Sequence, residues 1–239
     1  MPPYAYLENG VPAGIDIAVA RHVFGQLGVP VTFELEPFAR CQSALKQGTA
    51  DVGLAISNTL DRQSFVHFPK SYVWLASFVF FTNKATLPGH TIAGLDDARK
   101  SGLRIGIIRG TSYHDRFWQT FPAQDKAVND GYNAALDPAA DTATNLRKLQ
   151  GNRIQLYPQD RSVGLWEAKR AGLGEVPYYD TVLFTKGYYN AFSRASHFSS
   201  SRYPDITALL AAYDAKLEEF KRSAQYQAIF AGVTQGQPK

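Results

Sequence analysis

The chain alternates between short segments rich in β-branched and aromatic residues and segments whose apolar residues recur with a period near 3.6. The first kind of segment is typical of β-strands, and the second is typical of amphipathic α-helices. Strands that follow one another with helices between them indicate an α/β protein, because each helix must cover one face of a sheet. This alternation excludes a helical bundle and an all-β sandwich.

The two patterns predict the order of the elements. The expected strands cover residues 31–35, 51–56, 73–81, 103–108, 154–157 and 187–192. The expected helices lie around residues 17–27, 41–45, 117–121, 146–149, 162–171 and 206–220. We expect Asp16 to cap the first helix and Thr111 or Ser112 to cap the third, because short polar side chains accept hydrogen bonds from a first turn's unpaired N–H groups.

Composition narrows the possible functions. Hydrophobic residues make up 45% of the chain and charged residues 19%, which are globular values rather than those of a disordered chain. No apolar run approaches the roughly 20 residues that a membrane-spanning helix needs. The 25 Lys and Arg residues against 21 Asp and Glu residues give a net charge of +4 without a basic block, so we expect no nucleic-acid partner.

Chemistry-bearing residues are sparse. The single cysteine, Cys41, excludes an internal disulfide, and its place in a short helix suits a buried thiol better than a nucleophile. The five histidines lack metal-ligand spacing, and of these His114 lies nearest to a candidate turn. The sequence contains none of the common hydrolase, zinc-protease or nucleotide motifs. We therefore expect no metal, no cofactor and no enzymatic activity.

Four segments together resemble a known family. They are Pro2-Pro3-Tyr4 followed by 14–17; 48–51 running on to Ser57 and Asp61-Arg62; 106–112; and 151–160. In this order and spacing the chain resembles the family-3 solute-binding proteins of ABC importers, the amino-acid-binding branch of the type II periplasmic binding proteins. The resemblance extends to residues 226–230, which look like the closing helix of the family.

The resemblance implies a two-lobed clamshell in which each lobe is a mixed sheet flanked by helices. Lobe 1 would comprise residues 1–84 and 187–239, lobe 2 would comprise residues 85–186, and hinge crossings would lie near Lys84 and Lys186. It implies a monomeric periplasmic protein that captures a polar or aromatic amino acid, or a similar zwitterion, in the cleft between the lobes and delivers it to ABC permease subunits. A dehydratase-like enzyme and a ligand-sensing input domain are the alternatives on this fold.

The sequence itself shows no signal peptide, because Met1 precedes two prolines rather than a basic and then an apolar stretch.

The resemblance assigns the carboxylate-binding residues of lobe 1. Arg62 stands where the family has the arginine that holds the ligand's α-carboxylate, and a guanidinium offers that group two parallel donors. A surface arginine paired with Asp61 or Asp51 is the alternative. Ser57 matches a hydroxyl that donates to the same carboxylate, although a serine at this position also simply ends a strand.

The resemblance also assigns residues of lobe 2. Thr111 and Ser112 look like the family's turn whose backbone N–H groups face the carboxylate, a role compatible with an ordinary helix cap. Asp160 matches the aspartate that receives the ligand's α-ammonium in a charge-assisted bond. Its alternative is to cap the helix that follows it.

Further residues are candidates for the pocket wall. Phe38 falls where family members place an aromatic ring against the ligand, and Tyr4 lies near the first loop. Each of these rings also fits a core position. Arg40 and Tyr157 are candidate selectors of the ligand's side chain, and a cation at Arg109 would favour an acidic ligand or repel a basic one.

Overall fold

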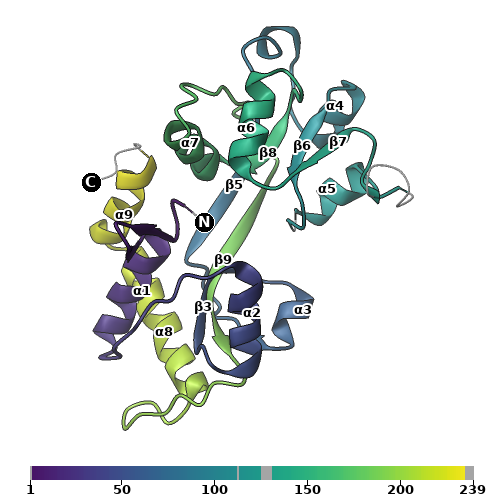
Figure 1. Cartoon of the computed structure of the whole chain (residues 1–239). Coiled ribbons are helices and arrows are strands. Elements are labelled where there is room, and N and C mark those ends of the chain that lie inside the picture. The colour runs from purple at the N-terminus through teal and green to yellow at the C-terminus, as the bar shows by residue number, and fades with distance from the viewer. Residues whose placement is uncertain (1, 112, 125–130, 235–239) are drawn as a thin grey trace. The chain divides into compact units, whose positions relative to one another are not determined.

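A computed structural model describes residues 2–111, 113–124 and 131–234 (Figure 1). The chain divides into two compact units. Unit 1 comprises Met1–Leu75 and Gly187–Lys239, and unit 2 comprises Ala76–Lys186. The chain passes from one unit to the other inside two strands, β5 (Trp74–Phe81) and β9 (Phe184–Ser193).

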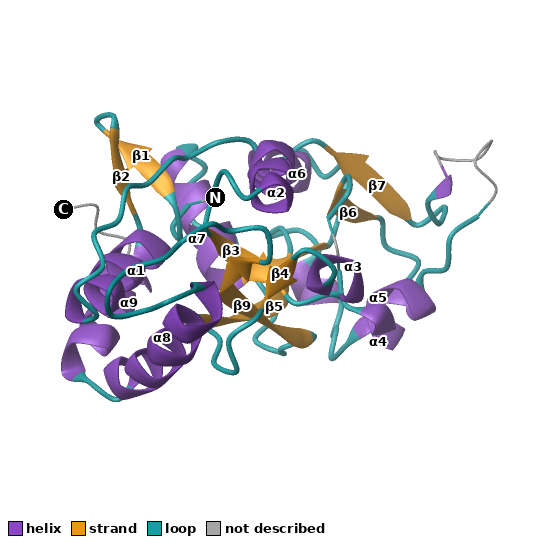
Figure 2. Cartoon of the chain, turned by 90° about the horizontal axis from the view of Figure 1, so that it is seen from below, coloured by secondary structure: helices purple, strands orange, loops and turns teal. Residues whose placement is uncertain are grey.

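Unit 1 combines the first part of the chain with its last part. Its helices are α1 (Ile15–Gln26), α2 (Phe38–Gln47), α3 (Leu60–Gln63), α8 (Ile206–Lys221) and α9 (Ala224–Thr234). Its strands, besides the ends of β5 and β9, are β1 (Tyr6–Glu8), β2 (Val11–Ala13), β3 (Val52–Ser57) and β4 (Val66–His67). Both β3 and β4 pair antiparallel with β9. The helices α1, α8 and α9 lie side by side (Figure 1), and the β1–β2 hairpin lies against α1 (Figure 2).

Unit 2 is continuous in sequence. Its helices are the 3-10 turn η1 (Leu87–Gly89), α4 (Leu95–Lys100), α5 (Asp115–Thr120), α6 (Thr142–Gln150) and α7 (Arg161–Arg170). Its strands, besides the ends of β5 and β9, are β6 (Ile105–Ile108), β7 (Leu136–Ala139) and β8 (Tyr157–Asp160). The strands β6 and β7 are parallel, whereas β5 and β8 are antiparallel with Phe78 opposite Asp160.

Each unit has its own apolar core. In unit 1, Leu45 of α2 packs with Ile56, Val66 and Ala191 of the sheet. In unit 2, eight buried residues form one cluster: Val79, Phe81, Leu146, Leu149, Ile154, Tyr157, Ala168 and Val176. A β-carbon at Gly164 would lie 2.2 Å from the Phe81 ring, so only a glycine lets α7 approach the sheet this closely.

The α/β class and most predicted elements are confirmed, and their bounds shift by a few residues. The predicted strand at 31–35 is wrong, because residues 29–37 have no regular structure. Its alternating apolar residues are half-buried without a partner strand among the described residues, and the Phe33 ring lies 5.4 Å from the guanidinium carbon of Arg21 in α1. The strand predicted at 154–157 begins later, at Tyr157.

Two predicted helix caps are also wrong. The N-cap of α1 is Gly14 rather than Asp16, which lies buried inside the first turn. The N-cap of α5 is His114, whose Nδ1 accepts a hydrogen bond from the backbone N–H of Arg116 at 3.2 Å. Ser112, the other cap candidate, lies outside the described residues.

The Cys41 thiol is half-buried instead of buried, with its Sγ 3.5 Å from the Glu36 carbonyl oxygen. Within the described part of the chain, no helix has the length and apolar character that crossing a bilayer requires.

Candidate functional site

The strand β3 and the single-turn helix α3 bring Arg62 and Ser57 together. Ser57 is the last residue of β3, and one helical turn from Leu60 folds the chain back toward the strand end. Arg62 Nη1 donates to the Ser57 carbonyl oxygen at 2.9 Å and to Ser57 Oγ. These bonds hold one edge of the guanidinium and leave donors on Nε and Nη2 for another acceptor.

The surroundings of Arg62 suit anion binding. Its guanidinium carbon lies 5.0 Å from the centre of the Phe38 ring, which stacks below it as a cation–π partner. Burial lowers the pKa of Arg62, and the nearby Tyr188 and Asp61 act in the opposite direction. Among the described residues no carboxylate lies within salt-bridge distance of this guanidinium. Arg62 is thus a partly desolvated cation held in place by a neutral group.

Another candidate of unit 1, Tyr4, belongs to an aromatic stack. Its ring is parallel to that of Trp74, with centroids 3.4 Å apart, and the indole stacks on Tyr188 at 4.1 Å. Tyr4 and Trp74 are buried. The indole N–H of Trp74 donates to Asp16 Oδ1 at 2.8 Å. The sequence predicted Asp16 only as a helix cap and did not predict the contact between Trp74 and Tyr188, because no local pattern marks rings that meet from distant parts of a chain.

In unit 2, Asp160 lies where β8 ends and α7 begins. Its Oδ1 accepts a hydrogen bond from the backbone N–H of Val163, and its Oδ2 accepts one from that of Ser77, both at 3.0 Å. The residue is therefore the N-cap of α7 and is 4% exposed. A carboxylate has about four lone-pair sites, so a cap can also accept from an ammonium group.

The turn after β6 holds the other candidates of unit 2. Gly110 has a φ of 69°, and the backbone N–H of Thr111 donates to the Ile108 carbonyl at 3.2 Å. The hydroxyl of Tyr113 accepts from the backbone N–H of Ile108 at 3.1 Å, which ties the turn to β6. Ser112 falls outside the described residues, and Arg109 is exposed.

The other candidates divide between surface and core. Arg40 is exposed on α2. Tyr157 is fully buried, and its hydroxyl bonds with Thr142 Oγ1 at 3.1 Å and with Gln159 Nε2 at 2.7 Å. Burial raises the pKa of Tyr157. This environment gives Tyr157 a structural role.

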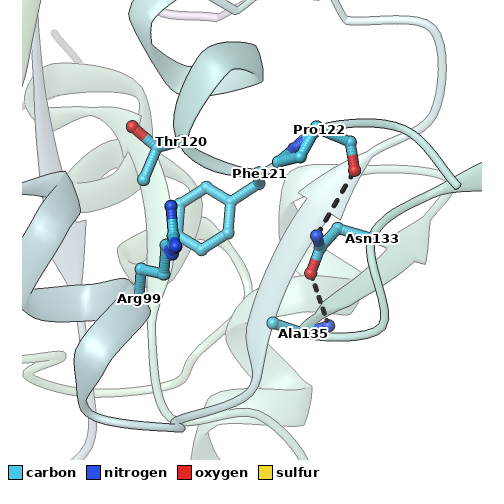
Figure 3. A pocket seen from close by; sticks show the side chains of 6 residues that line it. All are labelled: Arg99, Thr120, Phe121, Pro122, Asn133 and Ala135. Atoms are coloured by element: carbon cyan, nitrogen blue, oxygen red, sulfur yellow. Dashed lines mark hydrogen bonds between the residues drawn. The ribbon is translucent and has the colours of Figure 1, made fainter.

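Two hollows lie within single units. One, of about 290 Å³, is in unit 2 (Figure 3) and is lined by Arg99, Thr120, Phe121, Pro122, Asn133 and Ala135. The other, of about 340 Å³, is in unit 1 between the β1–β2 hairpin and α1. Neither hollow includes a predicted site residue. The described residues contain no group of three or more His, Cys, Asp or Glu side chains that is placed to hold a metal ion.

Solved structures identify the fold as that of the periplasmic binding proteins. A histidine kinase sensor domain with similarity to periplasmic binding proteins matches 97% of this chain and 91% of its own, with a TM-score of 0.72 and 22% identity. The ancestral amino acid-binding protein AncCDT-1, a precursor of cyclohexadienyl dehydratase, matches 98% of this chain and 91% of its own, with a TM-score of 0.72 and 18% identity. At such identities the likeness shows the fold alone.

The family follows from the sequence match. The model of the bacterial extracellular solute-binding proteins, family 3, matches residues 1–233, so the chain belongs to this family, as its motifs predicted. The probable amino-acid-binding protein YxeM of Bacillus subtilis (strain 168) is 22% identical over 188 residues, which are 76% of this chain. The match spans 66% of that relative's length. Membership places the chain among extracytoplasmic binding proteins.

Proposed function

We propose that this protein binds an amino acid or a similar small zwitterion outside the cytoplasm and delivers it to the membrane permease of an ABC importer. The family consists of solute-binding proteins. YxeM is named as a probable amino-acid-binding protein, and AncCDT-1 is an ancestral amino acid-binding protein. These descriptions support the choice of ligand class.

The arrangement of Arg62 is the observation that carries the proposal. Partial burial strengthens the attraction of a guanidinium for a carboxylate, because less water screens the two charges. The alternative of a surface ion pair is less favoured. Asp61 is exposed and forms no salt bridge with Arg62 among the described residues, and Asp51 accepts a hydrogen bond from the Ser196 hydroxyl.

The proposal assigns the ligand's two ends to groups from different units. Arg62 and Ser57 of unit 1 would bind the α-carboxylate, helped by the turn at Thr111 and Ser112, and Asp160 of unit 2 would bind the α-ammonium. Such a ligand favours a closed state by its differential affinity for that state, through hinges that we predict near residues 84 and 186. The protein would act as a monomer.

The proposal also holds that the ligand leaves unchanged. The family and the named relatives are binding proteins, although AncCDT-1 is a precursor of a dehydratase. Incubation with the tightest-binding amino acid followed by mass spectrometry tests this point. A new product mass would favour the enzyme, whereas recovery of the amino acid supports the receptor.

A melting screen with the twenty L-amino acids tests the ligand. At least one is expected to raise the melting temperature, since a ligand at 100 times its Kd stabilises the native state by about 2.7 kcal/mol. Arg62→Ala should abolish that rise, because it removes the carboxylate's fixed cation. The matched control is Arg222→Ala, an exposed arginine at the end of α8, which should leave the rise intact. Equal ligand binding by Arg62→Ala and wild type would overturn the assignment.

A further inference from the structure

Trp74 fills a slot between two tyrosine rings of unit 1. The plane of its indole makes an angle of 2° with the Tyr4 ring and of 15° with the Tyr188 ring. The centroid distances of 3.4 and 4.1 Å leave no room between the three rings. The side chain is 2% exposed. Aromatic rings in contact prefer offset or edge-on geometries unless something else orients them. The Tyr4–Trp74 pair, with parallel planes and centroids only 3.4 Å apart, has almost no offset and therefore calls for a separate orienting contact.

Asp16 supplies that contact. It is fully buried in the first turn of α1, and its Oδ1 accepts the indole N–H of Trp74 at 2.8 Å. Its Oδ2 has no hydrogen-bond partner in the part of the chain that the structure describes. A buried carboxyl group with an unsatisfied oxygen destabilises a fold. The hydrogen bond from the indole N–H offsets part of the cost of burying Asp16.

The stack continues to the predicted carboxylate-binding residues. Tyr188 of β9 lies directly opposite Ser57 of β3 in the antiparallel ladder. Opposed residues in such a ladder have α-carbons only about 4.5–5.5 Å apart. Ser57 in turn accepts two hydrogen bonds from Arg62, whose charge also interacts with the Tyr188 side chain. A continuous chain of contacts links Asp16 to the guanidinium.

Resting on the function proposed above, we propose that Asp16 and Trp74 are positioning residues for the carboxylate-binding group. The Asp16 carboxyl orients the indole through its N–H, and the indole holds the Tyr188 ring beside Ser57 and Arg62. Neither residue needs to touch the ligand in this role. If Trp74 only filled the core, its N–H would be irrelevant and its ring volume would be all that mattered.

The N–H is therefore the feature to test. Trp74→Phe keeps an aromatic ring but loses the donor, and Asp16→Leu removes the acceptor. Asp16→Asn keeps an acceptor oxygen and is expected to behave closer to wild type than Asp16→Leu. Trp74→Ala opens the slot, which free indole can refill with its N–H, whereas 1-methylindole supplies the same ring system with a methyl group in place of the donor hydrogen.

The first readout needs no ligand. In ¹⁵N-labelled protein, the Nε–Hε signal of Arg62 is identified by its loss in Arg62→Lys. Trp74→Phe and Asp16→Leu should shift this signal, and indole should restore it in Trp74→Ala better than 1-methylindole does. Trp166→Phe, in α7 of unit 2, is the matched control and should leave the signal in place.

The second readout is affinity for whichever of the twenty L-amino acids stabilises the wild type. Loss of one buried hydrogen bond should weaken binding by up to about tenfold in Trp74→Phe and Asp16→Leu. Should Trp74→Ala fail to fold, Trp74→Phe and the two Asp16 variants still test the positioning role. An unshifted Arg62 signal in folded Trp74→Phe, or equal rescue by the two indoles, would overturn the positioning role. Absence of any amino-acid binding by wild type would instead contradict the proposed function, and the Arg62 signal would still test the contact chain.

Discussion

Two buried aspartates at helix starts, Asp16 in α1 and Asp160 at α7, have opposite surroundings. Asp160 immediately precedes its helix, and both of its oxygens accept backbone N–H groups. Asp16 lies inside its helix, with one oxygen bonded to an indole and the other unpartnered among the described residues. The position relative to the first turn decides whether a helix's free N–H groups can satisfy a carboxylate.

Close packing explains why α1 lacks an acidic cap. Its N-cap, Gly14, has a φ of 111°, and a β-carbon there would lie 2.4 Å from the Tyr4 carbonyl oxygen. Only glycine fits, so no aspartate can occupy this cap. Burial alone therefore does not determine whether a carboxylate stabilises or destabilises the fold. The outcome depends on whether N–H donors are within reach of both of its oxygens.

The largest expected effect is the pH dependence caused by Asp16. Burial raises the pKa of Asp16 to about 7 from an ordinary 3.8, and the Trp74 hydrogen bond acts against this rise. The folded state then binds more protons than the unfolded state between these values, so stability falls as pH rises from about 4 to 7. The full cost above pH 7 is about 4 kcal/mol.

Urea denaturation from pH 4 to 8 measures this cost. Asp16→Asn, which cannot ionise, should flatten the decline and be more stable than wild type at pH 8 but not at pH 4. A wild-type decline that persists unchanged in Asp16→Asn would show that Asp16 does not cause the pH dependence.

Removing the Asp160 carboxylate should have the opposite effect on stability and destabilise the fold. Asp160→Ala leaves the N–H groups of buried Val163 and half-buried Ser77 without their acceptor and is expected to cost about 2–3 kcal/mol at pH 7. Asp160→Asn retains one acceptor oxygen and should cost less. Urea denaturation checks both variants.

The same Asp160→Asn variant tests whether Asp160 binds the amine of the ligand. It should weaken the binding of amino acids far more than the binding of carboxylic acids that lack the amine, because the amine loses its ionic partner. Titration calorimetry with matched pairs measures this difference. Equal weakening of both would leave Asp160 as a helix cap without a role in amine recognition.

The smallest expected effect concerns an exposed cap. Asp141 accepts from the backbone N–H of Thr144 at 2.7 Å at the start of α6, and this bond lowers the pKa of Asp141. Asp141→Ala should cost about 1 kcal/mol at pH 7. Its stabilisation is present above the ordinary carboxyl pKa and disappears as pH falls through the lowered one. Denaturation at pH 7 and pH 2 checks this, and a cost that stays constant at both pH values would assign the effect to helix propensity.

Local patterns explain what the sequence predicted well. Ser57 and Arg62, which the sequence predicted to serve one ligand group, are joined by hydrogen bonds across a strand end and one helical turn, so neighbouring residues determine their contact. The cap at Asp160 is equally local, and the helical periodicity of α8 marks its buried face. Features of this kind need no knowledge of the rest of the chain.

Long-range contacts explain what the sequence did not predict. The apolar alternation at 31–35 is typical of a strand, but pairing depends on a partner that the segment itself does not specify. Asp16 looks like a cap because its type suits one, and the approach of Tyr4 that reserves the cap for Gly14 comes from tertiary packing. The stack of Tyr4, Trp74 and Tyr188 joins three segments that are distant in the sequence, so no local pattern predicts it.

The two units differ in when their contacts can form during synthesis. Unit 2 lies in one uninterrupted stretch, 76–186, and has all of its residues once that stretch has left the ribosome. Unit 1 needs 187–239 as well, because α8, α9 and most of β9 complete it. The indole of Trp74 can therefore meet Tyr188 only after all of unit 2 has been synthesised, and residues 1–75 cannot complete their core before then.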